Sequence, residues 1–376
     1  MTAFLPAAVP FSSSVQFFGV QQPNVGAAFS IIQQEFAHDI VQLSLYAQDV
    51  GADSYASGMP MVMTFGRPLV QRTFYGYVNH ASRQNTTLAG ASWQDRNMVN
   101  LVCVGASFWM KESGTLTFRG GTAAQAVQQI ATQFGLAADV VDDGTIWPVL
   151  HMAGMTYWEF CCMLARRIGY TFYCSGIQLV FKPRNTDPTQ LKGLVQYYDY
   201  RNNPFALPVF VPTIGANNPT GGQLANRILT GIDPRTSQVV TASMAGNPAT
   251  STLGVSSDTP LFDKTEHFTV RNQGEATVKV AGAGQSNQLY LTATASGGGD
   301  PMLAQGSLVY VTNVNGSQNG LWYITKCEQT MTATQFLMDM ELGRDSMGVT
   351  AVVTGVPQAA SLPQAKLVQN LWVAAA

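Results

Sequence analysis

The sequences TAAQAVQQIATQFG (residues 122–135) and TYWEFCCMLARRIG (residues 156–169) follow the same local pattern. Each begins with a threonine that is followed three positions later by Gln or Glu, carries apolar side chains at helical spacing, and ends at a glycine. A threonine with such a partner can form a capping box at the start of a helix, and a left-handed glycine commonly follows the last turn. The two stretches therefore predict two amphipathic helices.

A β-hairpin is predicted directly after the second helix. Residues 170–174 and 177–181 are strand-like runs, and Ser175-Gly176 between them is typical of a tight turn. Together the helices and the hairpin predict a small α+β domain that covers residues 111–185.

Short strands with turn residues between them are predicted on both sides of this domain, because apolar and polar residues alternate there, as at Val41, Leu43 and Leu45. The runs before it are 39–46, 61–65, 72–80 and 98–105, and those after it are 268–270, 276–281, 288–294, 307–312, 321–328 and 334–342. Gly282-Ala283-Gly284 is predicted to be a hairpin turn, since no helix is expected after it. Residues 217–259 are rich in Gly, Asn, Pro, Ser and Thr, which favours a long loop. The two β regions could be a diverged duplication, although the residues show no clear repeat.

The composition points to an assembly protein. Charged residues make up 11% of the chain, against an ordinary share of about 25%, while apolar residues make up 46%. A surface poor in charge suits a protein whose faces are covered by neighbouring subunits, although a weakly charged monomer stays an alternative. The net charge of −2 and the pI of about 6.1 argue against specific nucleic-acid recognition.

The cysteines and the chain ends bear on location and assembly. The five cysteines have no CxxC spacing, so neither a zinc site nor a disulfide framework is expected, and folding in a reducing cytoplasm is favoured. The N-terminus resembles no secretory signal, and no apolar run is long enough to span a membrane. Residues 1–38 and 351–376 are predicted to be terminal arms, and we expect residues 1–35 and 351–376 to pack on neighbouring chains.

No residue is predicted to be catalytic, cofactor-binding or metal-ligating, and the chain is predicted not to be an enzyme. The aspartates before Gly144 lack the alternation of a calcium loop, and the helix cap explains Glu159. The histidines lie far apart and form no metal-binding pattern. The histidines and acidic residues to which these arguments apply are His38, His80, His151, His267, Asp139, Asp142, Asp143 and Glu159. The six tryptophans are interpreted as core and interface anchors.

The ordered set of elements resembles the phage baseplate hub and late control protein D family, which is related to the valine-glycine repeat spike proteins of type VI secretion. The matching segments, in order, are residues 101–107, Phe118, 122–135, 155–160, 164–170 and 179–183, with further support from 300–306, 320–324 and 342–345. No single segment is specific, whereas the order of the set is.

This resemblance implies a mainly β fold in which two tube-like antiparallel β-barrels, residues 39–110 and 186–350, flank the α+β domain. It implies a structural hub of a bacteriophage baseplate, located in the virion tail, in which a homotrimer joins the sixfold tail tube to the threefold spike. The implied partners are a tail tube or distal tail protein and a spike protein, with tape-measure and baseplate wedge proteins as further candidates. The alternatives are a tail-associated peptidoglycan hydrolase and a hub or spike component of a type VI or other contractile injection system.

Overall fold

The computed structural model of the 376-residue chain describes residues 11–21, 28–46, 55–68, 70–85, 97–184, 193–196, 209–213, 224–233, 236–245, 262–267, 270, 272–286, 289, 291–312, 314, 318–345, 365–369 and 371–374. Among these residues, each helix is too short or too polar to span a lipid bilayer.

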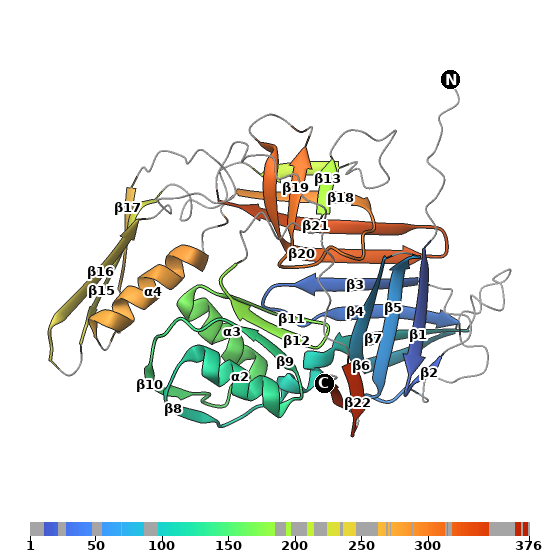
Figure 1. Ribbon diagram of the computed structural model, residues 1–376, viewed down its shortest axis with the longest axis horizontal. Coiled ribbons are helices and arrows are strands. Elements are labelled where there is room, and N and C mark those ends of the chain that lie inside the picture. Colours follow the sequence, from blue (N-terminus) through green and yellow to red (C-terminus); the bar gives the residue numbers. More distant parts are fainter. Residues whose placement is uncertain are drawn as a thin grey trace.

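The first β region is an antiparallel sheet with the strand order β3-β4-β7-β6-β5-β1-β2 (Figure 1). Its strands are β1 (Ser12–Phe17), β2 (Val20–Gln21), β3 (Ala28–Gln34), β4 (Ile40–Tyr46), β5 (Pro60–Arg67), β6 (Val70–Asn85) and β7 (Asn97–Gly105). The alternation predicted along β4 is present, because Val41, Leu43 and Leu45 are all buried. The region has a core of its own, which these residues share with neighbouring strands.

The second β region contains β13 (Gly193–Gln196), β14 (Val209–Thr213), β18 (Leu291–Gly298), β19 (Leu308–Thr312), β20 (Gly320–Thr332) and β21 (Phe336–Arg344). Strand β20 is long enough to take two partners along one side. Its first part pairs with β19, and its last part, Lys326–Thr332, pairs with β3 of the first region. The two regions therefore form one continuous sheet of 13 strands.

The first region curls back toward the second through side chains. The Arg67 guanidinium donates from Nη2 to the Gly299 carbonyl at 2.9 Å and lies 5.8 Å from the centroid of the Phe336 ring. The ring of Phe65 also meets Phe336 edge-on. These contacts join β5 to the β20–β21 end of the sheet, so the sheet is rolled rather than flat.

The α+β unit lies between the two regions in the chain. It comprises the 3-10 helix η2 (Ala106–Lys111), β8 (Thr117–Gly121), α2 (Ala123–Gln133), β9 (Ala137–Val140), β10 (Trp147–His151), α3 (Tyr157–Ile168), β11 (Thr171–Ser175) and β12 (Gln178–Lys182). Both predicted capping boxes are present, at Thr122 and Thr156, and Gly169 ends α3 in the left-handed conformation. The structure adds β9, which pairs in parallel with β12, and the pair β8–β10.

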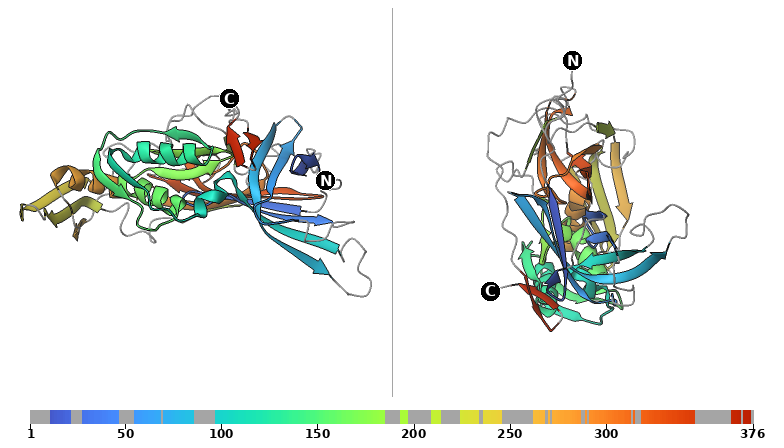
Figure 2. Two further views of the ribbon diagram at one scale, coloured as in Figure 1. Left: turned by 90° about the horizontal axis from the view of Figure 1, so that it is seen from below. Right: turned by 90° about the vertical axis from the view of Figure 1, so that its right-hand side faces the viewer.

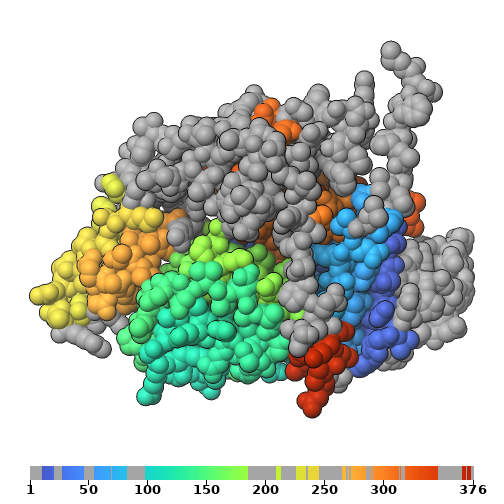
Figure 3. Space-filling view, viewed as in Figure 1, coloured from blue at the N-terminus to red at the C-terminus, as the bar shows by residue number. Residues whose placement is uncertain are grey.

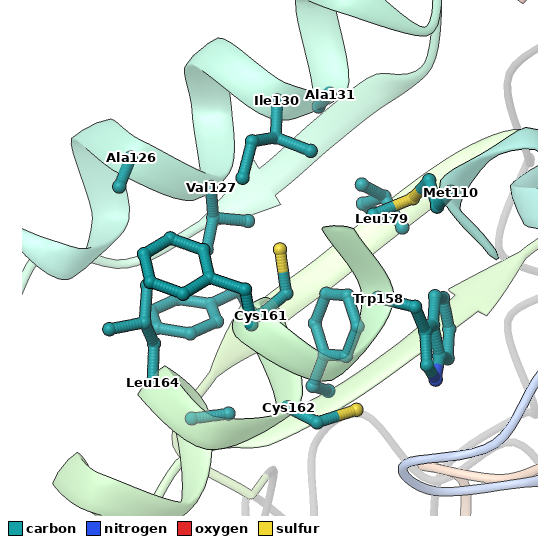
Figure 4. Close-up of a cluster of buried hydrophobic side chains, with 14 of the residues drawn as sticks. Met110, Ala126, Val127, Ile130, Ala131, Trp158, Cys161, Cys162, Leu164 and Leu179 are labelled. Atoms are coloured by element: carbon teal, nitrogen blue, oxygen red, sulfur yellow. The ribbon is translucent and has the colours of Figure 1, made fainter. Parts of the chain in front are cut away.

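The core of this unit is formed where α2 and α3 face each other. Figure 4 shows Val127 and Ile130 of α2 pointing toward Cys161 and Leu164 of α3. Phe160, on the apolar face of α3, is fully buried. The fold class inferred from the sequence, mainly β with a small α+β insert, is thus confirmed, whereas the exact limits of the domains stay predictions.

The loop predicted over residues 217–259 is wrong where the structure describes it. Strands β15 (Leu224–Ile232) and β16 (Val239–Ala245) form a hairpin, and β17 (Phe262–His267) pairs in parallel with β15. Their Ser, Thr and Asn residues, which favoured a loop, lie on or near the exposed face of this small sheet. Leu229, Val240 and Ala242 are buried on its other face and supply the apolar alternation that stabilises it.

The strand predicted over residues 276–281 and the hairpin turn at Gly282-Ala283-Gly284 are also wrong, because both lie in helix α4 (Gln273–Ser286). Val278 and Val280 produced a strand-like alternation, but the helix packs on the β15–β16 hairpin and on α3, so tertiary contacts override it. Figure 1 and the left view of Figure 2 show α4 between this sheet and α3, at one end of the molecule.

The N-terminal arm predicted over residues 1–38 is wrong for β1 and β3, which are strands of the main sheet. Val15 and Phe17 of β1, with Phe29 and Ile31 of β3, are buried in the chain's own core. The Pro, Gly and Ser residues around these strands obscured the alternation in the sequence. Residues 1–10 and 22–27 lie outside the described residues.

The C-terminal arm predicted over residues 351–376 is wrong for its described part. Strands β22 (Ala365–Val368) and β23 (Leu371–Ala374) form a hairpin, and Trp372 is buried. The Trp372 backbone N–H donates to Tyr77 Oη at 2.7 Å, and its indole Nε1 donates to the Gly76 carbonyl at 3.0 Å. Figure 3 shows the red hairpin beside the blue strands of the first region. Trp372 therefore packs on the chain's own first β region, contrary to the expectation that these residues lie apart from that core.

Candidate functional site: a buried polar junction

One carboxylate connects the two β regions to the α+β unit. Glu35 directly follows β3, and its side chain is buried. Its Oε1 accepts hydrogen bonds from Thr171 Oγ1 of β11 at 2.5 Å and from Tyr323 Oη of β20 at 2.6 Å. Its Oε2 accepts from Arg184, which follows the β11–β12 hairpin, at 3.0 Å from Nη2. Donors from the α+β unit and from the second β region therefore converge on one carboxylate of the first region.

A second carboxyl group lies four residues further along, at the start of β4. Asp39 is buried, and its two oxygens accept from Gln33 Nε2 at 2.7 Å and from Gln305 Nε2 at 3.0 Å. Gln305, in the loop before β19, also donates to the Cys174 carbonyl of β11 at 3.3 Å. Asp39 and Gln305 therefore repeat, with different residues, the three-way connection that Glu35 makes.

Arg72 of β6 reaches across the same boundary. Its Nη1 donates to the Leu303 carbonyl at 3.3 Å, and its Nη2 donates to Ser175 Oγ at 3.4 Å. We refer to Glu35, Asp39, Arg72, Arg184 and the side chains that bond to them as the polar junction. It contains two carboxyl groups and two guanidinium groups.

Burial shapes the electrostatics of the polar junction. Burial raises the pKa of Asp39 to about 7, although hydrogen bonds from Gln33 and Gln305 and the positive charge of Arg72 work in the other direction. Burial alone would lower the pKa of Arg184, but the Glu35 charge, the neighbouring Tyr323 and the hydrogen bond to Glu35 together outweigh burial, so the pKa is raised. Burial, helped by the Glu35 charge, also raises the pKa of Tyr323 well above its ordinary value, so its hydroxyl stays a donor.

The two glutamines that hold Asp39 each keep one polar atom without a hydrogen-bond partner. These atoms are Gln33 Oε1 and Gln305 Oε1, both buried acceptors. A protonated Asp39 carries an O–H, which is the kind of donor that these oxygens lack. The surroundings of Asp39 therefore agree with a carboxyl group that keeps its proton near neutral pH.

The polar junction can hold the two β regions and the α+β unit in a fixed arrangement. Each buried group is bonded to a partner on another part of the fold, and removing one partner leaves the other as an uncompensated buried charge or dipole. Relative movement of the α+β unit and the two β regions would have to break several such bonds together. The polar junction thus fixes the relative orientation of the three parts.

The histidines weighed from the sequence lie in separate places. His38 Nδ1 hydrogen-bonds Ser107 Oγ at 2.8 Å and its ring stacks on Trp158, with centroids 4.1 Å apart. Burial, followed by the positive charge of Lys111, lowers the pKa of His38 to about 4. His151 and His267 bond threonine hydroxyls on different sheets, and His80 is exposed on β6. Within the described residues, no three His, Cys, Asp or Glu side chains are grouped as metal ligands.

Of the acidic residues singled out in the sequence, Asp142 and Glu159 have local turn and cap roles, whereas Asp139 lies in β9. Asp142 Oδ1 accepts from the Gly144 backbone N–H at 3.0 Å, as in a turn, and Asp139 forms an ion pair with Lys182 at 2.5 Å. Glu159 Oε2 accepts from the backbone and the hydroxyl of Thr156, and these hydrogen bonds lower its pKa. All five cysteines are free and buried.

Sequence reasoning missed the polar junction. Its donors and acceptors come from segments more than a hundred positions apart, as with Thr171 and Glu35. One signal was available: in a chain with so few charges, Glu35 and Asp39 flank a turn between two strands that are otherwise apolar and neutral, and Arg184 ends a buried hairpin.

The fold and the junction define a class: a mainly β protein in which one rolled sheet forms two regions, held to an α+β unit by buried polar bonds. Three solved structures share this fold. The tail protein from Neisseria meningitidis MC58 is 12% identical, with a TM-score of 0.61, over 89% of this chain and 97% of that chain. The 43 kDa tail protein of prophage MuSo2 from Shewanella oneidensis is 13% identical, with a TM-score of 0.60, over 89% and 98%.

The third structure is the E. coli c3393 protein, a component of the type VI secretion system with structural similarity to the T4 bacteriophage tail proteins gp27 and gp5. It is 10% identical, with a TM-score of 0.55, over 88% of this chain and 77% of that chain. No protein-family model matches the sequence, and no curated protein does. At these identities the likeness establishes the fold, and it confirms the resemblance to hub-type tail proteins at that level.

Proposed function

We propose that this chain is a structural, non-enzymatic baseplate hub of a bacteriophage tail, which acts as a homotrimer joining the sixfold tail tube to the threefold spike. The observation that carries the proposal is the extent of the fold similarity, which runs through 97% and 98% of two solved tail proteins. A shared fold by itself does not fix a function, so the proposal also has to explain features of this chain.

The continuous sheet supports the symmetry part of the proposal. Because β3 pairs with β20, the two β regions form one rigid arc rather than two hinged domains. A trimer of such arcs would present six similar β units to a tail tube and keep threefold symmetry toward a spike. We propose that these units are the first β region, which includes β1 and β3, and the second β region, with the α+β unit on the outside.

The polar junction supports a mechanical role. A hub that transmits force between a tube and a spike requires fixed angles between its parts. Glu35 bonds directly to both of the other parts, and Asp39 is connected to them through Gln305. The partners we propose are a tail tube or distal tail protein, a spike protein, and tape-measure and wedge proteins around them. The location would then be the virion tail, after folding in the host cytoplasm.

A hub or spike role in a type VI or other contractile injection system is the second candidate. It is favoured by the fold similarity to the c3393 protein, a component of the type VI secretion system. The two candidates share the trimer and differ in the particle that contains it.

Native mass spectrometry of the purified chain, followed by a reconstruction of the particle that contains it, tests the proposal. We expect a trimer whose subunits contribute two β units each to a six-unit ring at the end of a phage tail. A stable dimer or hexamer, or a single β unit per chain in the ring, would contradict the adaptor role. A band of cell-wall digestion in a zymogram would contradict the non-enzymatic part.

A further inference from the structure

Within the described residues, the first and last strands in the order of the main sheet, β14 and the β1–β2 hairpin, carry exposed apolar side chains. At one end the turn between β1 and β2 exposes Phe18 by 53%, and Val20 beside it is 65% exposed. At the other end β14 exposes Val209 by 47% and Val211 by 53%. Phe210, which lies between Val209 and Val211, is buried, so the two valines form the outward face of β14, and Phe18 is exposed in the turn that follows the buried Phe17.

Phe18 has a backbone conformation that its side chain does not favour. Its φ is +50°, and that of Gly19 is +76°, so both central residues of this two-residue turn are left-handed. Such turns strongly favour Asn-Gly, because asparagine and glycine tolerate positive φ, whereas a bulky residue there is an outlier. The isolated chain thus keeps an aromatic ring in a strained conformation and exposes it to water. Strain of this kind commonly marks a site of function.

The two ends also lack the charges that normally protect sheet edges. Strand β14 and the β1–β2 hairpin contain no Asp, Glu, Lys, Arg or His. Edge strands of soluble proteins are usually protected by charged residues, proline or a covering element. Among the residues of these strands that the structure describes, Pro212 of β14 is the one such device, because it has no N–H to extend the strand ladder. A contact at β14 would therefore form through side chains rather than through further strand pairing.

We infer that the Phe18–Val20 turn of one copy docks on Val209 and Val211 of the next copy. Both surfaces are apolar and uncharged, so neither leaves an unpaired charge when the other covers it. Because the two surfaces are different patches of the same chain, the contact is head-to-tail, and such contacts make a closed ring when the rotation between copies closes. This inference rests on the proposed homotrimer and identifies the surfaces that would hold it together.

The substitution Phe18→Asn tests the inference without damaging the fold. Asparagine suits the left-handed turn better than phenylalanine, so we expect an unchanged or higher melting temperature together with loss of the trimer in native mass spectrometry. Val211→Asn, on the opposite surface, should also abolish the trimer. The control is Ile146→Asn, which removes a 69% exposed side chain on the α+β unit and should leave the trimer intact.

Cross-linking provides the geometric test. A chain with both Phe18→Cys and Val211→Cys should form covalent dimers and trimers on oxidation, whereas each single variant should not, since all five native cysteines are buried. If the wild type is a trimer and both asparagine variants remain trimers, the inference is wrong and the hub proposal stands. If the wild type forms no trimer, the proposed trimer itself is wrong. A variant that stays trimeric but fails to join tail particles would assign the Phe18 surface to another tail protein and overturn the inference.

Discussion

Glu35 Oε2 accepts hydrogen bonds from Nη2 and Nε of Arg184, at 3.0 and 3.3 Å, although 149 positions separate the two residues. Glu35 lies just after β3 of the first β region, and Arg184 lies just after the hairpin of the α+β unit. Both side chains are largely buried, at 5% and 11% exposure. Their bond is therefore a fixed connection between two parts of the fold rather than a surface ion pair.

Replacing Glu35 by glutamine should destabilise the chain strongly. The substitution keeps the shape of the side chain but leaves the Arg184 guanidinium buried without its counter-charge, and breaking a buried pair in this way costs about 3–5 kcal/mol. Denaturant unfolding of Glu35→Gln should show a loss of this order. The matched control is Glu341→Gln, because the Lys326–Glu341 pair is exposed and worth at most about 1 kcal/mol. Equal effects of the two substitutions would mean that the buried pair contributes nothing specific.

Asp39 should make stability depend on pH. Its pKa rises from 3.8 to about 7 in the folded chain, so the folded state holds the proton more tightly than the unfolded state does. This contribution is complete below about pH 4 and is lost as the pH rises toward and through 7, by about 1.36 kcal/mol for each unit of pKa difference. Relative to Asp39→Asn, the wild type should lose stability between pH 5 and 8. Parallel stability curves for the two chains over that range would show that Asp39 does not titrate there.

Phe160 should behave as a core residue of the α+β unit. It is fully buried on α3, and its ring stacks with that of Phe118 at a centroid distance of 6.1 Å. Truncating a buried phenylalanine costs about 3–5 kcal/mol, so Phe160→Ala should lower the melting temperature clearly. Val149→Ala, at a largely exposed position of the same unit, is the control and should change it little. An unchanged transition for Phe160→Ala would contradict this packing.

Gly282 should be required where α4 crosses α3. A Cβ at this position would overlap the carbonyl group of Arg167, so Gly282→Ala must push the two helices apart. Overpacking of this kind costs about 1–3 kcal/mol. Gly274→Ala in the same helix is the control, since its Cβ would lie at an ordinary 3.4 Å from Asn272 Oδ1 and alanine favours helix. Hydrogen exchange along α4 should speed up in Gly282→Ala alone; the same acceleration in both variants would contradict the close approach.

The parts of the fold that could be predicted are those with local signals. Thr122 with Gln125 and Thr156 with Glu159 mark helix starts within four residues, and both capping boxes are present. Helix α4 also begins with a side-chain cap, since Asn272 Oδ1 accepts from the Glu275 backbone N–H at 2.8 Å. An asparagine at this position is a local signal for a helix start. The alternation of Val278 and Val280 outweighed it in the sequence, whereas packing on α3 decides the structure.

The polar junction could not be predicted, because its geometry depends on tertiary contacts. Neither Glu35 nor Tyr323 has a sequence neighbour that indicates its partner, and their oxygens meet only because β20 pairs with β3. The same pairing explains why the two β regions, which look independent along the chain, form one sheet. The burial of a single polar residue, unlike a helix cap or an alternation of apolar residues, depends on the whole fold and leaves no pattern in adjacent positions.

Trp372 should stabilise the first β region from the C-terminal end of the chain. It is buried beside Tyr75, with ring centroids 5.2 Å apart, and its two N–H groups donate to Tyr77 Oη and the Gly76 carbonyl. Trp372→Ala should cost about 3–5 kcal/mol and increase hydrogen exchange in β6. Trp372→Phe should cost less, because it keeps an aromatic ring and loses one bond, leaving the Gly76 carbonyl without its donor at a cost of about 1–3 kcal/mol.

Val368→Ala, at an exposed position of the same hairpin, is the control and should have little effect. If Trp372→Ala leaves stability and exchange unchanged but abolishes assembly, the hairpin docks on a neighbouring chain, as the terminal-arm hypothesis predicted, and the contact within the chain is not the one that matters.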